Sequence, residues 1–318
     1  MLIEVFLLLS SLVLLYIGAE LALNSSEQIG LRLGLSPLAI GMVLVGMGTS
    51  LPELFVSHIA TIQDSYQIAL GNIIGSNIAN TFFILAIASL IIPLKLEDKS
   101  LRENLIFHFI LSLLIIFNFW FHQKLDIFSL SYLFLFFVIY LYFVYRDMKK
   151  EKVVEQVQEE QTENGKFTDK TPVLTFFMLS GFALLYSGGE LLVSSGTLVC
   201  QYFGISEYVI SVILVSIGTS LPELITSVVS ALKGKHTDIV VGNIIGSNIF
   251  NVAFVLGSLG IYDITFEQPY LYEIAALITV SLFLLSMSYF KKTLNRLSGL
   301  VFLGIYAAFI YYWLKVMN

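Results

Sequence analysis

Long apolar runs recur along the entire chain, and they constrain the fold more than any other feature of the sequence. Of 318 residues, 57% are hydrophobic and 13% are charged, and the mean hydropathy is +0.86. A helix needs about 20 consecutive apolar residues to cross a bilayer, so the pattern predicts an all-α membrane protein with many spans. We predict ten transmembrane helices, at residues 2–23, 36–61, 67–93, 101–121, 126–146, 171–198, 206–232, 237–260, 270–290 and 297–316.

The distribution of basic residues supports this count. If ten spans alternate in direction, 15 of the 17 Lys and Arg residues fall on one side of the membrane, and only Lys124 and Lys315 fall on the other. By the positive-inside rule, we expect both termini to lie outside a cell membrane and the polar segment 147–170 to be a flexible cytoplasmic linker. The first run starts at Met1 without a basic segment or a small-residue cleavage site, so we interpret it as a retained span.

Three sequence motifs occur twice in the chain. The offset is 170 residues for the first two motifs and 171 for the third, so one residue is inserted between Lys233 and Asp238. Each copy holds five spans, and because five is odd, the two halves enter the membrane in opposite senses. The pattern predicts two inverted five-helix repeats, 1–146 and 171–318, with a binding site near the midplane where they meet. The motif pairs are Leu15–Glu20 with Leu185–Glu190, Gly48–Leu54 with Gly218–Leu224, and Gly71–Ile78 with Gly242–Ile249.

The heptapeptide Gly-Thr-Ser-Leu-Pro-Glu-Leu places a carboxylate, Glu53 or Glu223, inside an apolar run. A charge in such a run is costly and indicates a functional site. Pro52 and Pro222 lack an N–H, so each loosens the helical turn before it and releases carbonyl oxygens. Carbonyl, hydroxyl and carboxylate oxygens are the ligands that hard cations such as Ca²⁺ prefer. We therefore predict that these two glutamates bind a cation rather than serve as structural carboxylates.

The motif Gly-Asn-Ile-Ile-Gly-Ser-Asn-Ile supplies a second set of oxygens. Ser76 and Asn80 lie four residues apart, on one helical face, and Ser247 and Asn251 repeat the pattern. We predict that each pair presents a hydroxyl and an amide oxygen to the centre, while the glycines form a close packing face. The other asparagines are interpreted as helix-end and interhelical hydrogen-bonding residues: Asn72, Asn77, Asn243 and Asn248.

Other polar residues and motifs receive structural interpretations. Glu20 and Glu190 recur near the ends of their spans and are interpreted as symmetric structural or gate residues, not ligands. His58 has Val228 as its repeat counterpart and is interpreted as a satisfied core residue. The sequence contains no nucleotide-binding, metal-hydrolase or covalent-nucleophile pattern, and Cys200 has no histidine nearby. We therefore predict no enzyme activity and no cofactor, with transport driven by an ion gradient.

The two long motifs, each present twice in a ten-span chain, resemble those of the calcium/cation antiporter superfamily, in the branch of the prokaryotic sodium/calcium exchangers. The resemblance implies that spans two, three, seven and eight surround the ions, while spans one and six slide to alternate access. It implies metal ligation by the following residues, with the threonines acting through backbone carbonyls: Thr49, Ser50, Glu53, Ser76, Asn80, Thr219, Ser220, Glu223, Ser247 and Asn251.

The charge of this ligand set has consequences for coupling. In the family that the motifs resemble, some prokaryotic members and the potassium-dependent exchangers carry Asp where this chain has Asn251. Both copies of the motif here end in Asn, and this departure argues against potassium co-transport. The two remaining carboxylates carry a charge of −2, which one Ca²⁺ matches. Three Na⁺ would leave the site at +1, so an exchange of three Na⁺ for one Ca²⁺ would move charge across the membrane.

The sequence therefore predicts an antiporter that exchanges Ca²⁺ for Na⁺ by alternating access. Its implied partners are these two ions and the lipid bilayer, with no nucleic acid and no obligate protein partner. Two alternatives stay open. In a Ca²⁺/H⁺ antiporter the two glutamates would carry protons, and in a cation channel the carboxylate pair would act as a filter. Inverted halves are typical of alternating access, whereas channels usually close a ring of subunits.

Overall fold

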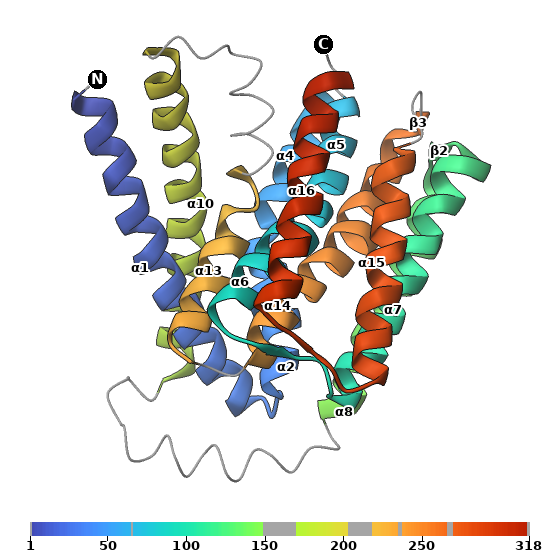
Figure 1. Ribbon diagram of the computed structural model, residues 1–318, viewed down its shortest axis with the longest axis horizontal. Helices are drawn as coiled ribbons and strands as arrows, with labels where there is room; N and C mark the ends of the chain where they lie inside the picture. The colour runs from blue at the N-terminus through green and yellow to red at the C-terminus, as the bar shows by residue number, and fades with distance from the viewer. Residues whose placement is uncertain are drawn as a thin grey trace.

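The computed structural model describes residues 2–64, 66–148, 170–202, 218–234, 237–265 and 270–316. Within these ranges, nine helical segments are long and apolar enough to cross a membrane, and the helix Leu221–Leu232 is a shorter apolar one. The predicted helical membrane fold is confirmed (Figure 1). Most of the expected linker 147–170, and residues 206–217 of the expected seventh span, lie outside the described residues.

The first half of the chain consists of helices joined by short loops. Elements labelled η1, η2 and η3 are π-helical stretches that continue directly into or out of α-helices. In chain order the elements are α1 (Leu2–Arg32), α2 (Pro37–Ala39), η1 (Ile40–Gly46), α3 (Met47–Thr49), α4 (Leu51–Ile62), α5 (Tyr66–Ile78), η2 (Ala79–Ile84), α6 (Leu85–Ile91), β1 (Leu94–Lys95), α7 (Lys99–Ile116), η3 (Phe117–His122), β2 (Lys124–Leu125) and α8 (Ile127–Met148).

The second half repeats this order. Its π-helical stretch η5 is followed by a short 3₁₀ segment, η6. The described elements are α10 (Thr171–Tyr202), α13 (Leu221–Leu232), α14 (Thr237–Ile249), η5 (Phe250–Leu256), η6 (Leu259–Tyr262), β3 (Ile264–Thr265), α15 (Leu271–Tyr289), β4 (Thr293–Leu294) and α16 (Arg296–Val316).

Helix α1 is longer than predicted, because it continues to Arg32 instead of ending at residue 23. The polar residues that follow are held within the protein: Asn24 donates to the carboxylate of Glu20 at 3.2 Å, and Ser26 is fully buried. Hydropathy predicts where a helix leaves lipid, but here protein contacts replace lipid and the helix continues. It ends before Gly34, whose positive φ of +76° is favourable for glycine.

Helices α1 and α10, the first of each repeat, cross closely and run in opposite directions (Figure 1). A Cβ atom on Gly18 would lie 2.9 Å from the carbonyl oxygen of Gly181, and one on Gly181 would lie 2.5 Å from the backbone nitrogen of Ala22. Small residues at the crossing therefore allow the two backbones to touch. The opposite directions agree with the inverted arrangement expected from five spans per repeat.

Two short strand pairs join the repeats at opposite ends of the molecule (Figure 1). Strand β1 pairs antiparallel with β4, and β2 pairs antiparallel with β3. Each pair takes one strand from each repeat. The strand pairs therefore fasten the loops of the two halves to each other on both sides of the bundle.

The helices of the second long motif lie at the centre of the bundle. In the span Thr237–Tyr262, 94% of the most apolar window is buried inside the protein. The corresponding share is only 17% in the span Arg296–Trp313, at the periphery. Helix α14 packs against η1, where a Cβ on Gly246 would lie 2.4 Å from the carbonyl oxygen of Met42. The predicted glycine packing face is thus confirmed for this copy. It is wrong for the first copy, where a Cβ on Gly75 would meet no atom within 4 Å.

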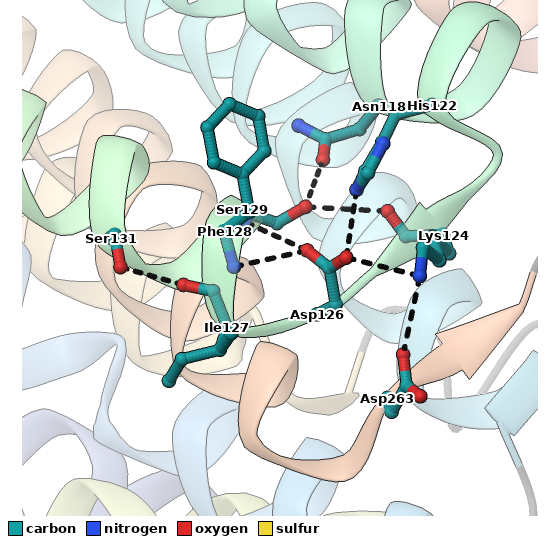
Figure 2. Close-up of polar contacts among 9 residues, drawn as sticks. All are labelled: Asn118, His122, Lys124, Asp126, Ile127, Phe128, Ser129, Ser131 and Asp263. Carbon is teal, nitrogen blue, oxygen red and sulfur yellow. Dashed lines mark hydrogen bonds and ion pairs between the residues drawn. The ribbon is translucent and has the colours of Figure 1, made fainter.

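Asp126 caps the start of α8 and gathers a polar cluster around it (Figure 2). Its Oδ1 accepts hydrogen bonds from the backbone N–H groups of Ser129 at 3.0 Å and Phe128 at 3.1 Å. Its Oδ2 lies 3.0 Å from His122 Nε2 and 3.2 Å from Lys124 Nζ. Hydrogen bonds to the carboxylate, the one from the Ser129 backbone foremost, hold the pKa of Asp126 below its ordinary range.

Asp126→Ala should destabilise the protein by about 1 kcal/mol, because the first turn of α8 loses its N-cap. The measurement is the unfolding midpoint of the purified protein in detergent. Asp263→Asn is the control, because Asp263 is 73% exposed and its ion pair with Lys124 spans 3.9 Å, and exposed pairs contribute little. Equal midpoints for Asp126→Ala and the unmodified protein would contradict the capping role.

Candidate cation site

Each repeat has a helix interruption at the heptapeptide motif. The chain leaves α3 at Ser50, with φ −88° and ψ 9°, and enters α4 with Pro52 in the first turn. Ser220 has nearly the same backbone, with φ −88° and ψ 7°, immediately before α13. The interruption predicted from Pro52 and Pro222 is therefore confirmed in both copies.

Glu53 and Glu223 lie in the first turns of α4 and α13, and neither side chain is exposed to solvent. The Ser50 hydroxyl donates to Glu223 Oε1 at 2.7 Å, and the Ser220 hydroxyl donates to Glu53 Oε1 at 3.5 Å. Each carboxylate thus accepts a hydrogen bond from the opposite repeat. A position at a helix N-terminus also favours a negative charge. The motifs of the two halves therefore meet, as the sequence predicted.

The second oxygen of each carboxylate is buried without a hydrogen-bond partner. Glu53 Oε2 and Glu223 Oε2 share this property with the amide oxygens of Asn80 and Asn251. A buried polar atom without a partner is costly and calls for a physical explanation. All four atoms belong to the ligand set implied by the family resemblance, and all are hard oxygen donors of the kind that Ca²⁺ and Na⁺ bind. The residues present therefore fit a bound cation.

Ser76 and Ser247 each contact the opposite repeat through their hydroxyls. Ser76 Oγ lies 3.4 Å from Thr219 Oγ1, and Ser247 donates to the carbonyl oxygen of Gly46 at 3.0 Å. Both are buried. The structure thus places these two candidate ligands at the interface between the repeats, beside the two helix interruptions.

Asn80 and Asn251 lie in π-helical turns, which the sequence pattern did not predict. Ser76 belongs to α5 and Ser247 to α14, but Asn80 is in η2 and Asn251 is in η5. The change in helix type occurs at the same point of both motifs. Single π-helical turns are rare and are found frequently at functional sites. Both asparagines are fully buried.

Asn72 and Asn243 connect the two interrupted helices to the opposite repeat. Asn72 Nδ2 donates to the carbonyl oxygen of Glu53 at 3.3 Å, and its Oδ1 accepts from Thr219 at 3.0 Å. Asn243 repeats both contacts with Glu223 at 3.4 Å and Thr49 at 3.3 Å. The predicted interhelical role is confirmed. The predicted helix-end role is wrong, because both asparagines lie within their helices.

Two serines that also bind these asparagines were not identified from the sequence. Asn72 Nδ2 also donates to Ser57 Oγ at 3.0 Å, and Asn243 Nδ2 donates to Ser227 Oγ at 3.0 Å. The signal was available, because Ser57 and Ser227 occupy the same position of the two repeats. Each lies one helical turn after its glutamate, on the same side of the helix.

Glu20 and Glu190 have different surroundings, although the sequence suggested symmetric roles. Glu20 forms an ion pair with Lys233. Each glutamate accepts a hydrogen bond from a tyrosine four residues earlier, Glu20 from Tyr16 and Glu190 from Tyr186 at 2.8 Å, but no ion pair is found for Glu190 among the described residues. Glu190 lines a cavity of about 600 Å³ that extends to Thr219 beside the second helix interruption. The repeat counterpart of Lys233 is Gln63, so the first repeat offers no equivalent cation for Glu190.

His58 is bonded through both ring nitrogens, Nδ1 to Tyr262 at 3.0 Å and Nε2 to Ser258 at 2.8 Å. Its interpretation as a satisfied histidine is confirmed, but it is only partly buried and so is not a core residue. Among the residues that the structure describes, no group of three or more His, Cys, Asp or Glu side chains is placed to hold a metal ion. The candidate site therefore combines two carboxylates with neutral oxygens.

The fold and these paired oxygen clusters define a class: a polytopic membrane transporter for cations, built from two halves of opposite orientation. A family model described as "Sodium/calcium exchanger protein" matches residues 3–146 and 173–315. The chain belongs to this family. The resemblance to the prokaryotic exchangers is therefore confirmed, and the protein is an ion exchanger, not an enzyme.

Individual relatives cover nearly the whole chain. The "Putative antiporter CaxA" of Alkalimonas amylolytica is 31% identical over 98% of both chains. The sodium/calcium exchanger MaX1 of Methanosarcina acetivorans is 30% identical over 96% of both. Among solved structures, the sodium-calcium exchanger NCX_Mj soaked with Na⁺ and Sr²⁺ matches with a TM-score of 0.81, at 28% identity over 98% of both chains.

Asn72→Ala and Asn243→Ala should each destabilise the protein by about 1–3 kcal/mol, because several buried groups lose their hydrogen-bond partner. Unfolding in detergent without added ions measures the effect. Asn77→Ala is the matched control, since Asn77 is a buried asparagine of α5 whose Nδ2 donates to its own helix, at Ile73 O. If all three variants unfolded alike, the bracing between repeats would not be a source of stability.

Proposed function

We propose that the protein is an antiporter that moves Ca²⁺ out of the cell against an inflow of Na⁺, with both ions bound between the two repeats. The observation that carries the proposal is the set of four buried, unpartnered oxygens on Glu53, Glu223, Asn80 and Asn251. Family membership and the names of the relatives support the choice of ions.

We propose the ten implied ligands as the ion-binding residues. The side chains supply carboxylate, hydroxyl and amide oxygens, and the two threonines supply backbone carbonyls. The threonine hydroxyls are engaged elsewhere: Thr49 donates to Asn243 Oδ1 at 3.3 Å, and Thr219 donates to Asn72 Oδ1 at 3.0 Å. This agrees with a role for their carbonyls rather than their hydroxyls.

The charge of the site supports electrogenic exchange. Two carboxylates are balanced by one Ca²⁺, whereas three Na⁺ leave one positive charge in excess. Carriage of protons by the same glutamates would instead give Ca²⁺/H⁺ exchange. The neutral oxygens of Ser76, Ser247, Asn80 and Asn251 favour Na⁺, because they can supply ligands for several Na⁺ ions at once.

Alternating access is proposed to follow from movement of α1 and α10 against the central helices. These two helices pack on each other through Gly18 and Gly181, and only 28% and 22% of their most apolar windows are buried. The different surroundings of Glu20 and Glu190 support a structure that is closed at one end and open at the other. Glu20 is paired with Lys233, whereas Glu190 lines a cavity that extends to Thr219. A channel would need no such difference between its ends.

We propose that residues 1–146 and 171–318 are the two repeats, and that 147–170 is a cytoplasmic linker. The first and last described residues lie on the same side of the bundle (Figure 1). The C-terminal ends of α1, α8 and α13 lie on the opposite side (Figure 1), and each carries a basic residue: Arg32, Arg146 and Lys233. The positive-inside rule assigns that basic side to the cytoplasm.

Glu53→Gln and Glu223→Gln should each reduce Ca²⁺ transport to background while the protein still folds, because each removes half of the negative charge of the site. Uptake of radioactive Ca²⁺ into proteoliposomes loaded with Na⁺ measures this. Glu273→Gln is the control, because Glu273 is a buried carboxylate bonded to Trp313 at 2.7 Å, outside the candidate site. Full exchange in either site variant would exclude these glutamates as ligands.

The same vesicles, loaded with Na⁺, K⁺ or a proton gradient in turn, separate the candidate functions. Ca²⁺ uptake should require Na⁺ inside and should saturate. Uptake driven by protons would favour Ca²⁺/H⁺ exchange. Uptake that needs no counter-ion and does not saturate would indicate a channel.

A cysteine placed within 147–170 should be protected from an impermeant thiol reagent in intact cells, while Asn318→Cys should be labelled. Cys200→Ser provides the background for both. The expectation follows from the distribution of Lys and Arg among the loops. The reverse labelling pattern would invert the proposed orientation, and labelling of both positions would contradict the ten-span count.

A further inference from the structure

The orientation of the Asn80 amide decides what this residue offers to a cation. An amide side chain has an oxygen that accepts and an NH₂ group that donates, and only the oxygen attracts a cation. Asn80 Nδ2 donates to Asn248 Oδ1 at 3.1 Å. Its Oδ1 is buried and has no hydrogen-bond partner. The donor end of the amide is therefore anchored on α14, and the acceptor end is available to the site.

The amide of Asn248 is itself held in one orientation. Its Nδ2 donates to Thr81 Oγ1 at 2.9 Å and lies 3.2 Å from Nε2 of His108, on α7. If this amide were inverted, its NH₂ group would face the NH₂ group of Asn80. Two donors would then oppose each other in a buried place, and Asn80 would have to turn its oxygen away from the site.

The partners of His108 identify which ring nitrogen accepts. Nδ1 lies 2.8 Å from Ser281 Oγ, and Ser281 donates its own hydrogen to the carbonyl oxygen of Leu277 at 2.6 Å. Because that hydrogen is committed, Nδ1 carries the ring hydrogen and donates to Ser281. Nε2 then has a lone pair and accepts from Asn248. We assign this tautomer from the partners of the ring.

These contacts form one chain of hydrogen bonds that joins four helical elements, η2, α14, α7 and α15. Each bond from Asn80 through Asn248, His108 and Ser281 donates in the same direction, and the chain ends at the carbonyl of Leu277 on α15. All four side chains are buried. A chain of this kind has a single consistent polarity, so the backbone carbonyl at its far end determines the orientation of Asn80.

Among the residues that the structure describes, no equivalent chain orients the second amide, Asn251. Asn77, the counterpart of Asn248, donates to its own helix at Ile73 O, at 2.8 Å. Both amide atoms of Asn251, the counterpart of Asn80, are buried without a partner. Helix α15, the counterpart of α7, contains no histidine. Only one of the two candidate amide ligands is therefore oriented by the protein.

We propose that Asn248 and His108 are positioning residues that hold the Asn80 amide with its oxygen toward the cation. This rests on the proposed ion site between the repeats. The site then contains one amide oriented before the ion arrives and one, Asn251, that the ion itself orients. Loss of the chain lowers affinity for Ca²⁺, because part of the binding free energy is used to order Asn80.

His108→Leu tests the proposal, because it removes the acceptor for Asn248. We expect the KM for Ca²⁺ to rise roughly three- to tenfold, which is the scale of one hydrogen bond, with little change in the maximal rate. His108→Gln should restore the KM, since its side-chain oxygen can accept from Asn248. Asn77→Leu, at the counterpart position outside the chain, should leave the KM unchanged.

A double variant separates positioning from a general structural role. In Asn80→Asp, both ends of the side chain are oxygens, so its orientation no longer matters. His108→Leu should therefore have little further effect on the KM in this background, giving a large coupling between the two positions. Ser281→Ala, a smaller change that releases the ring hydrogen of His108, should raise the KM in the same direction and lose its effect in Asn80→Asp.

Two results would overturn the proposal. One is an unchanged KM in both His108→Leu and Ser281→Ala. The other is an increase that persists in the Asn80→Asp background or that His108→Gln does not reverse. Either result is distinct from failure of the ion site itself, because that failure would appear as full exchange in Glu53→Gln or Glu223→Gln.

Discussion

Two carboxylates are buried at the centre of an apolar bundle, and the arrangement of the helices around them follows from the cost of that burial. Neither Glu53 nor Glu223 is exposed, and removal of a charge from water costs several kcal/mol unless partners replace the water. The protein places each at a helix N-terminus and supplies one hydroxyl, from Ser220 or Ser50. Each hydroxyl belongs to the opposite repeat. Neither half alone can therefore complete its own site, and the other carboxylate oxygen is available to a cation.

The inverted duplication explains how the two halves are joined around this site. Asn72 and Asn243 each link a glutamate carbonyl in their own repeat to a threonine of the other. The strand pairs join the loops of the two halves at both ends of the molecule. The equivalence is nevertheless incomplete, as the different partners of Glu20 and Glu190 show. In this conformation the two ends of the molecule are therefore unequal, and equivalent residues meet different neighbours.

The class of fold and the chemistry of the site could both be predicted from the amino-acid sequence. Apolar runs report which segments belong in lipid, because the requirement for about 20 apolar residues is local. The duplicated motifs indicated the inverted halves, and the residue types indicated hard-cation chemistry. The interruptions before Glu53 and Glu223 were also predictable, because the missing N–H of Pro52 or Pro222 acts within its own turn.

Individual contacts between residues far apart in the chain could not be predicted from the sequence. The extension of α1 to Arg32, the ion pair of Glu20 with Lys233 and the contacts of His108 depend on neighbours far away in the chain. The π-helical turns at Asn80 and Asn251 likewise carry no signal in the periodicity of the sequence. Local sequence patterns predict whether a segment lies in lipid or in water, and which hydrogen bonds form or fail within one helical turn. They do not indicate which helices are neighbours, and that arrangement determines which way the buried amide of Asn80 points.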